Sequence, residues 1–184
     1  GVGATPMYYA KNLYLNGKPV TFVAVPQDVT ALNYTFCGFK DLTQVTLPDS
    51  LTSIGDYAFY SCSSLTSISI PDSVTNIGWG ALHSCSSLAS ITIPDSVTSI
   101  GNSAFYGCSK LINIGIGSGV VSIGSEVLSG CSSLVSITIP DSVTSIGEGA
   151  FSGCRGLTSI TIPNGATSIG ASTFYGCSSL TSIT

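Results

Sequence analysis

Residues 88–110 read LASITIPDSVTSIGNSAFYGCSK, and this unit decides the fold because it is repeated along most of the chain. Its first residue recurs every 23 positions, at Leu42, Leu65, Leu88, Leu111, Leu134, Leu157 and Leu180. The sequence between successive leucines is nearly copied each time. A unit this short with one apolar side cannot bury that side alone, so the units are expected to stack into a solenoid.

Each unit predicts two short strands. In the quoted unit, Ile91 and Ile93 lie two residues apart, which is the period of a strand with one buried side. Pro94 then ends the strand because proline has no N–H to donate, and the Asp-Ser pair after it favours a turn. Residues 97–100 predict the second strand. The first strands of successive units are expected to form a parallel sheet.

The end of the unit predicts a short helical element. Gly101 recurs in every full unit, which indicates a backbone bend that a Cβ atom would oppose. Residues 104–108 then place an alanine, a phenylalanine and a cysteine toward one side. That spacing suits a single helical or 3-10 turn better than a strand.

The repeats divide the chain into three predicted segments. Residues 1–41 contain an N-terminal hairpin cap, indicated by Asn16-Gly17 between β-rich runs, followed by a divergent first repeat. Residues 42–179 are six 23-residue repeats, and residues 180–184 start a truncated seventh. We expect further chain, or end-to-end self-association with another copy, to cover that edge.

The pattern L-x-x-I-x-I-P-D-S-V-T-x-I-G-x-x-A-F-x-x-C resembles the BspA-like, or treponemal-type, leucine-rich repeat of surface proteins from bacteria and some protists. The resemblance covers residues 42–184, and residues 12–32 resemble the opening segment of such arrays. It implies an α/β repeat solenoid, a right-handed coil with a parallel β-sheet on the concave face, short second strands and short helical or 3-10 turns elsewhere. It also implies a secreted or cell-surface adhesion module, without identifying a ligand.

The charge pattern excludes several classes of partner. Five Lys and Arg residues against nine Asp and Glu give a net charge of −4, with no basic cluster. Nucleic acids and anionic membrane surfaces are therefore disfavoured as partners. Every apolar run is too short to span a bilayer, so membrane insertion is not expected. The chain begins Gly1-Val2-Gly3, and any secretion signal is expected to have been removed or to lie outside it.

The residues that could carry chemistry are few. His83 is the one histidine, which excludes pairs of histidine ligands. Six cysteines share one column, Cys62, Cys85, Cys108, Cys131, Cys154 and Cys177. Equivalent side chains in a stack point the same way, so we expect free buried thiols rather than disulfides. The aspartates of the Pro-Asp-Ser turns are expected to cap their own turns. We therefore expect no enzyme, no metal site and no cofactor.

Two surfaces are candidate binding sites for a protein or glycan ligand. The first is the outer side of the first strands, with Ser67, Ser69, Ser90, Thr92, Asn113, Ser136, Thr138, Ser159 and Thr161. These residues equally suit a strand that is merely solvated. The second is a set of aromatic residues after the glycine column, Tyr57, Tyr60, Trp79, His83 and Tyr106. Such side chains anchor interfaces, although isolated surface aromatics are also common.

The sequence thus predicts a non-catalytic extracellular interaction or adhesion module that binds a macromolecule of a host or neighbouring cell. The alternative is a structural or surface-recognition element. In that reading the regular Ser/Thr grid of the first strands binds a repetitive glycan or an ice-like lattice.

Overall fold

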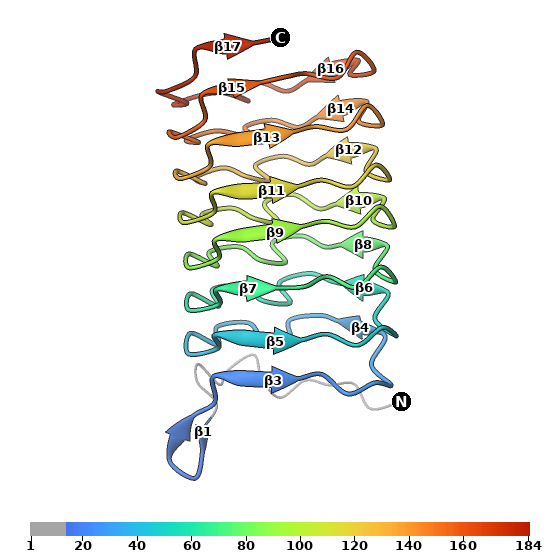
Figure 1. The fold of residues 1–184 in the computed structure, drawn as a ribbon, viewed down its shortest axis with the longest axis vertical. Coiled ribbons are helices and arrows are strands. Elements are labelled where there is room, and N and C mark those ends of the chain that lie inside the picture. The colour runs from blue at the N-terminus through green and yellow to red at the C-terminus, as the bar shows by residue number, and fades with distance from the viewer. Residues whose placement is uncertain (1–13) are drawn as a thin grey trace.

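The computed structural model describes residues 14–184 and shows a column of stacked turns, here called rungs, with one repeat in each (Figure 1). Strands alternate between two series along the chain. The first series is β3 (Phe22–Ala24), β5 (Gln44–Thr46), β7 (Ser67–Ile68), β9 (Ser90–Thr92), β11 (Asn113–Gly115), β13 (Ser136–Thr138), β15 (Ser159–Ile160) and β17 (Ser182–Ile183). The second is β4 (Ala31–Leu32), β6 (Ser53–Ile54), β8 (Asn76–Ile77), β10 (Ser99–Ile100), β12 (Ser122–Ile123), β14 (Ser145–Ile146) and β16 (Ser168–Ile169).

Within each series, neighbouring strands pair in parallel and in the register of the repeat. Ile100 of β10 lies opposite Ile123 of β12, its equivalent in the next rung. The second series forms one 7-stranded sheet, whereas the first is divided into sheets of three, three and two strands. Val23 of β3 lies opposite Val45 of β5, so the first rung is one residue shorter there than the others.

The core lies between the two series and is built from columns of like residues. Ile91 and Ile93 are 4% and 1% exposed, while Ser90 and Thr92, which alternate with them, face outward, as the strand period predicts. Phe105, on the segment that follows the second strand, is fully buried. Among residues 14–184, no side-chain nitrogen or oxygen is buried without a hydrogen-bond partner.

The predicted α/β class and its helical or 3-10 turns are wrong, because the described residues contain strands and turns but no helix. In the segment that follows each second strand, successive N–H groups instead bond alternately to the next rung and within their own rung. The N–H of Leu82 donates to the carbonyl of Ala104 in the next rung at 2.8 Å, while the next N–H, of His83, donates back to Gly80 at 3.1 Å. Gly80 and Ser84 take positive φ values of 57° and 59°. Because alternate donors bond to the neighbouring rung, a continuous helical series cannot form.

The recurring glycine is explained by a close approach between rungs rather than by an unusual φ. A Cβ atom on Gly101 would lie 2.6 Å from the carbonyl carbon of Gly78 and 2.7 Å from the backbone nitrogen of Trp79. Both of those atoms belong to the preceding rung. A side chain at this position would therefore push two rungs apart.

The hairpin expected at Asn16-Gly17 is present. Strands β1 (Tyr14–Leu15) and β2 (Lys18–Pro19) pair antiparallel, and Asn16 and Gly17 have positive φ values of 52° and 75°. The hairpin projects from the first rung in Figure 1, and the side chains of Tyr14 and Leu15 are 58% and 69% exposed, so they lie outside the core. The rest of the predicted cap, residues 1–13, lies outside the described residues. In the part of the chain that the structure describes, no helix is long and apolar enough to cross a membrane.

Replacing Gly101 by alanine should lower the free energy of unfolding by about 1–3 kcal/mol, because the new methyl group meets backbone that cannot rotate away. Gly115 on β11 is the matched control, since a Cβ atom there would meet the side chain of Thr92 at an ordinary 3.5 Å. The change Gly115→Ala should be neutral or stabilise by up to about 1 kcal/mol. Urea unfolding measures the free energy of unfolding of both variants. If the two substitutions change it equally, the close approach between rungs does not constrain position 101.

Candidate functional site

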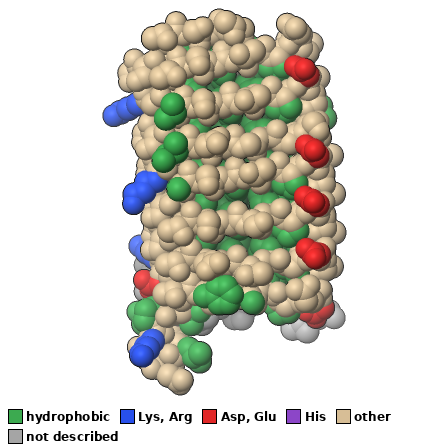
Figure 2. Space-filling view, viewed as in Figure 1, with side chains coloured by type: hydrophobic (Ala, Val, Ile, Leu, Met, Phe, Trp, Pro, Cys, Tyr) green, Lys and Arg blue, Asp and Glu red, His purple; other side chains and the backbone are tan. Residues whose placement is uncertain are grey.

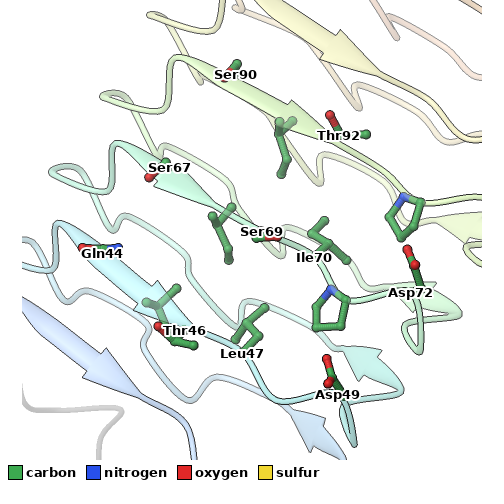
Figure 3. Close-up of a pocket in the computed structure, with 15 residues that line it drawn as sticks. Gln44, Thr46, Leu47, Asp49, Ser67, Ser69, Ile70, Asp72, Ser90 and Thr92 are labelled. Carbon is green, nitrogen blue, oxygen red and sulfur yellow. The ribbon is translucent and has the colours of Figure 1, made fainter.

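The outer side of β5, β7, β9, β11, β13 and β15, here called the strand face, carries the predicted polar grid. Its nine predicted residues, Ser67, Ser69, Ser90, Thr92, Asn113, Ser136, Thr138, Ser159 and Thr161, are all exposed. Figure 3 shows Ser67, Ser90 and Thr92 on successive rungs, with Asp49 and Asp72 where the chain enters the proline turns. An open hollow of ≈ 700 Å³ lies over the first three of these rungs.

Hydrogen bonding separates the hydroxyl side chains into two groups. Those in the turns are used to join rungs: the hydroxyls of Ser73 and Ser96 each donate to a carbonyl of the preceding rung at 2.7 Å, and that of Thr75 does so at 3.3 Å. On the strand face, of the nine predicted residues, only Thr161 has a side-chain hydrogen bond within the described residues, to Thr184 at 3.1 Å. The strand face therefore presents donors and acceptors that the fold itself does not use.

Charge is confined to the edges of the strand face. In Figure 2 a row of acidic side chains follows one edge and basic side chains lie along the other, with uncharged side chains and backbone between them. The backbone N–H of Ser118 donates to Asp95 at 2.7 Å, and this bond lowers the pKa of the Asp95 carboxyl group. Ser118 belongs to the next rung, so Asp95 joins two rungs rather than capping its own turn as predicted.

The five predicted aromatic residues form one contiguous cluster. The rings of Tyr60, His83 and Tyr106 stack in a row with centroids 4.7 Å apart in both pairs. Beside them, the ring of Tyr57 lies 5.1 Å from Trp79 and 5.5 Å from Tyr60. Trp79 is 53% exposed and therefore lies outside the core. Although the segment is not helical, Trp79 and His83 do lie on the same surface.

A second open hollow, of ≈ 510 Å³ and here called the aromatic hollow, lies over this cluster. It is lined by Tyr34, Cys37, Tyr57, Tyr60, Trp79, His83 and Ser103. Tyr34, Cys37 and Ser103 are not among the residues that the sequence predicted for this surface. The repeat itself carries the signal for two of them, because Tyr34 and Cys37 stand 23 residues before Tyr57 and Tyr60.

The geometry around His83 does not assemble a hydrolytic centre. Its Nδ1 lies 2.9 Å from the hydroxyl of Ser84, which is its neighbour in the chain. Partial burial lowers the pKa of the His83 imidazole. Within residues 14–184, no carboxylate is hydrogen-bonded to this ring, whereas in a Ser-His-Asp triad an aspartate occupies Nδ1.

The cysteine column is built into the core. All seven cysteines are free thiols, and five members of the column are buried. The Sγ atom of Cys85 donates to the carbonyl of Phe59 at 3.2 Å, and Cys108 bonds in the same way to Leu82 at 3.3 Å. Burial raises the pKa of Cys108 to about 12. Since the thiolate is the reactive form, these thiols are poor nucleophiles. In the described part of the chain, no group of three or more His, Cys, Asp or Glu side chains is placed to hold a metal ion.

The stacked parallel rungs, the columns of leucine and isoleucine and the polar strand face define a β-solenoid of the leucine-rich-repeat class. The sequence profile "BspA type Leucine rich repeat region" matches residues 11–134 and 98–184. The chain belongs to this BspA-type leucine-rich-repeat family. Among curated proteins, none matches the sequence.

Solved bacterial structures share the fold. A leucine-rich repeat protein of T. pallidum is 31% identical with a TM-score of 0.81, over 88% of this chain and 78% of that one. One from Bacteroides ovatus is 30% identical with a TM-score of 0.76, over 89% of this chain and 49% of that one. A leucine rich cell surface protein of Faecalibacterium prausnitzii is 31% identical with a TM-score of 0.54, over 89% and 59%. The chain thus spans about half the length of the B. ovatus protein.

The buried thiols should make the protein sensitive to alkali. From about pH 9 to about pH 12 an unfolded chain carries thiolates, whereas burial keeps Cys108 protonated in the folded chain. The unfolded state then binds fewer protons, so the free energy of unfolding falls as pH rises, by about 1.4 kcal/mol per pH unit for each such thiol. Below pH 9 the thiols are protonated in both states and this contribution stays constant.

Urea unfolding in the presence of a reductant, repeated across this range, measures the slope. In the variant Cys108→Ala this slope should be less steep, by the contribution of one thiol. In Cys37→Ala, where the cysteine is less buried, the slope should change less. Identical slopes for the parent protein and Cys108→Ala would show that the thiol ionises in the folded protein.

Proposed function

We propose that the chain is a non-catalytic interaction module that acts at the cell surface or after secretion and binds a macromolecule of a host or neighbouring cell through its strand face. The observation that carries this proposal is the row of exposed hydroxyl groups that the fold leaves unpaired, from Ser67 to Ser159. Other hydroxyls of the same type, such as those of Ser73 and Ser96, are bonded to the neighbouring rung.

The physical properties of the strand face suit recognition of a large partner. Each hydroxyl can donate and accept a hydrogen bond, so the strand face can bind a partner surface that offers donors, acceptors or both. Its backbone is held on both sides by neighbouring rungs, so binding requires little ordering of the chain. The acidic row along one edge, including Asp49 and Asp72, would orient a partner that is basic on one side.

The comparisons support the location and the general role. The F. prausnitzii relative is described as a cell surface protein, and the chain belongs to the same kind of repeat family. Repeat solenoids present long, rigid surfaces that suit binding to extended partners. The proposal carries this general role over to the chain, with the strand face as the contact surface.

A repetitive lattice, such as a crystalline glycan or ice, is the alternative ligand. A lattice requires an unbroken grid with the same spacing along the solenoid. The grid is interrupted at β11, where Asn113 and Gly115 replace the Ser-Thr pair, and Ile112 beside them is 55% exposed. This interruption favours a partner with an irregular surface.

The proposal predicts that charge placed on the strand face abolishes binding without unfolding the protein. The paired change Ser69→Lys and Thr92→Lys adds two charges at exposed side chains that make no hydrogen bond in the described structure. The control pair Ser178→Lys and Ser179→Lys makes the same charge change at exposed positions far along the solenoid.

Binding is measured with the parent protein on panels of immobilised host matrix proteins and glycans, and each ligand found is then tested with both variants. The strand-face pair should bind at least about tenfold more weakly, a loss of about 1.4 kcal/mol, while the control pair binds as the parent does. Circular dichroism melting should be unchanged in both. If every ligand binds both variants and the parent equally, the strand face is not the binding surface.

A further inference from the structure

The aromatic hollow differs in chemistry from the strand face. Five of its seven lining residues carry aromatic rings, and the other two are Cys37 and Ser103. None of the seven is aliphatic, and none is an acidic residue, a lysine or an arginine. An open hollow with this lining suits a neutral ligand that has both C–H and hydroxyl groups.

The rings present two different kinds of surface. The rings of Tyr60, His83 and Tyr106 are nearly parallel, with interplanar angles of 28° and 14° between neighbours. The ring faces that lie against each other are covered, so the polar edges are left to contact a ligand. Trp79 is tilted by 54° to Tyr57 and is more than half exposed. Its indole therefore offers a flat surface beside a row of polar ring edges.

Those ring edges supply hydrogen-bonding groups of both kinds. The phenol groups of Tyr60 and Tyr106 each donate and accept. At His83 the Nδ1 atom is occupied by the hydroxyl of Ser84 at 2.9 Å, which leaves Nε2 for a ligand. If Nδ1 accepts from Ser84, Nε2 is a donor, and if Nδ1 donates, Nε2 is an acceptor.

We propose that the aromatic hollow binds a neutral saccharide, with the C–H face of one sugar ring on the indole of Trp79 and its hydroxyls on the ring edges of Tyr60 and His83, which line the hollow, and of Tyr106, which stacks on His83. The negative face of an aromatic ring attracts the weakly positive C–H groups of a sugar and disfavours an anion. A buried peptide anchor, in contrast, requires a closed and desolvated pocket, whereas this hollow is open.

The extent of the cluster limits the ligand to a short oligosaccharide. Tyr60 and Tyr106 are two rungs apart, roughly 10 Å at the strand spacing of a sheet. In the rungs that follow, Ser129 and Ser152 replace the stacked rings, and Ser125 and Glu148 occupy the column of Trp79. The aromatic surface is thus a single site with room for a di- or trisaccharide, and it shares no lining residue with the hollow on the strand face.

The sole tryptophan of the chain lies in this hollow, so its fluorescence reports binding directly. We would titrate the whole chain with cellotriose, chitotriose and galactotriose as neutral probes, and with trigalacturonate as the anionic counterpart. At least one neutral probe should give a saturable change with a dissociation constant of about 0.1–10 mM, a range typical of weak single-site binding. Trigalacturonate should bind at least about tenfold more weakly.

Variants are compared by saturation-transfer NMR of the ligand, which does not depend on tryptophan. Trp79→Ala should lose at least about tenfold in affinity, and Trp79→Phe should recover part of it. Tyr175→Ala is the matched control, since Tyr175 occupies the column of Tyr60 but lies in a rung beyond the cluster and is 74% exposed. It should bind as the parent does. The strand-face pair should also bind the probe normally, which separates this site from the proposed function.

Several outcomes would overturn the proposal. They are the absence of a saturable change with all three neutral probes, equal or tighter binding of trigalacturonate, and unchanged affinity in Trp79→Ala. A fluorescence response to leucine- and tyrosine-containing peptides but to none of the saccharides would identify the hollow as a peptide site and would equally contradict it.

Discussion

The backbone hydrogen bond between one rung and the next is the interaction on which the rest of the structure depends. It runs along both strand series and also along the segment that follows each second strand, here called the turn segment. There the N–H of Phe59 donates to the carbonyl of Ala81 at 2.7 Å, and that of Phe105 to the carbonyl of Val127 at 2.9 Å. Because these bonds are short and recur on several sides of every rung, they hold the separation of neighbouring rungs nearly constant. Every side chain in a column meets its equivalent at that separation.

That constant separation explains features that otherwise look unrelated. Where the turn segments approach most closely there is no space for a Cβ atom, so the position of Gly101 must be glycine. Buried cysteine fits the core because it is small and its thiol can donate to a carbonyl of the preceding rung. The centroids of aromatic rings at equivalent positions of neighbouring rungs lie 4.7 Å apart, so His83 stacks between Tyr60 and Tyr106. The two candidate binding surfaces therefore depend on the same bond as the core.

The sequence was sufficient to predict the strands and the core columns, because each depends on a spacing that the repeat displays directly. It named the members of the aromatic cluster but left open whether they lie together or apart. It did not predict the turn segment. The spacing of Ala104, Phe105 and Cys108 is the same whether their N–H groups bond within a helix or to another rung, so apolar periodicity cannot distinguish the two. The division of the hydroxyl groups was likewise hidden. The sequence places Ser69 on a strand and Ser73 in a turn, but it does not show that only Ser73 donates to the preceding rung.

The most direct measurement of the inter-rung bond is a long-range HNCO experiment on the protein labelled with ¹⁵N and ¹³C, which detects scalar coupling across individual hydrogen bonds. Bonding between rungs should give cross-peaks from the amide nitrogen of Leu82 to the carbonyl carbon of Ala104, and from that of Phe105 to the carbonyl carbon of Val127. Cross-peaks from these nitrogens to carbonyls four residues earlier in the chain would contradict bonding between rungs. They would show that the turn segment is helical and that the rungs are not joined there.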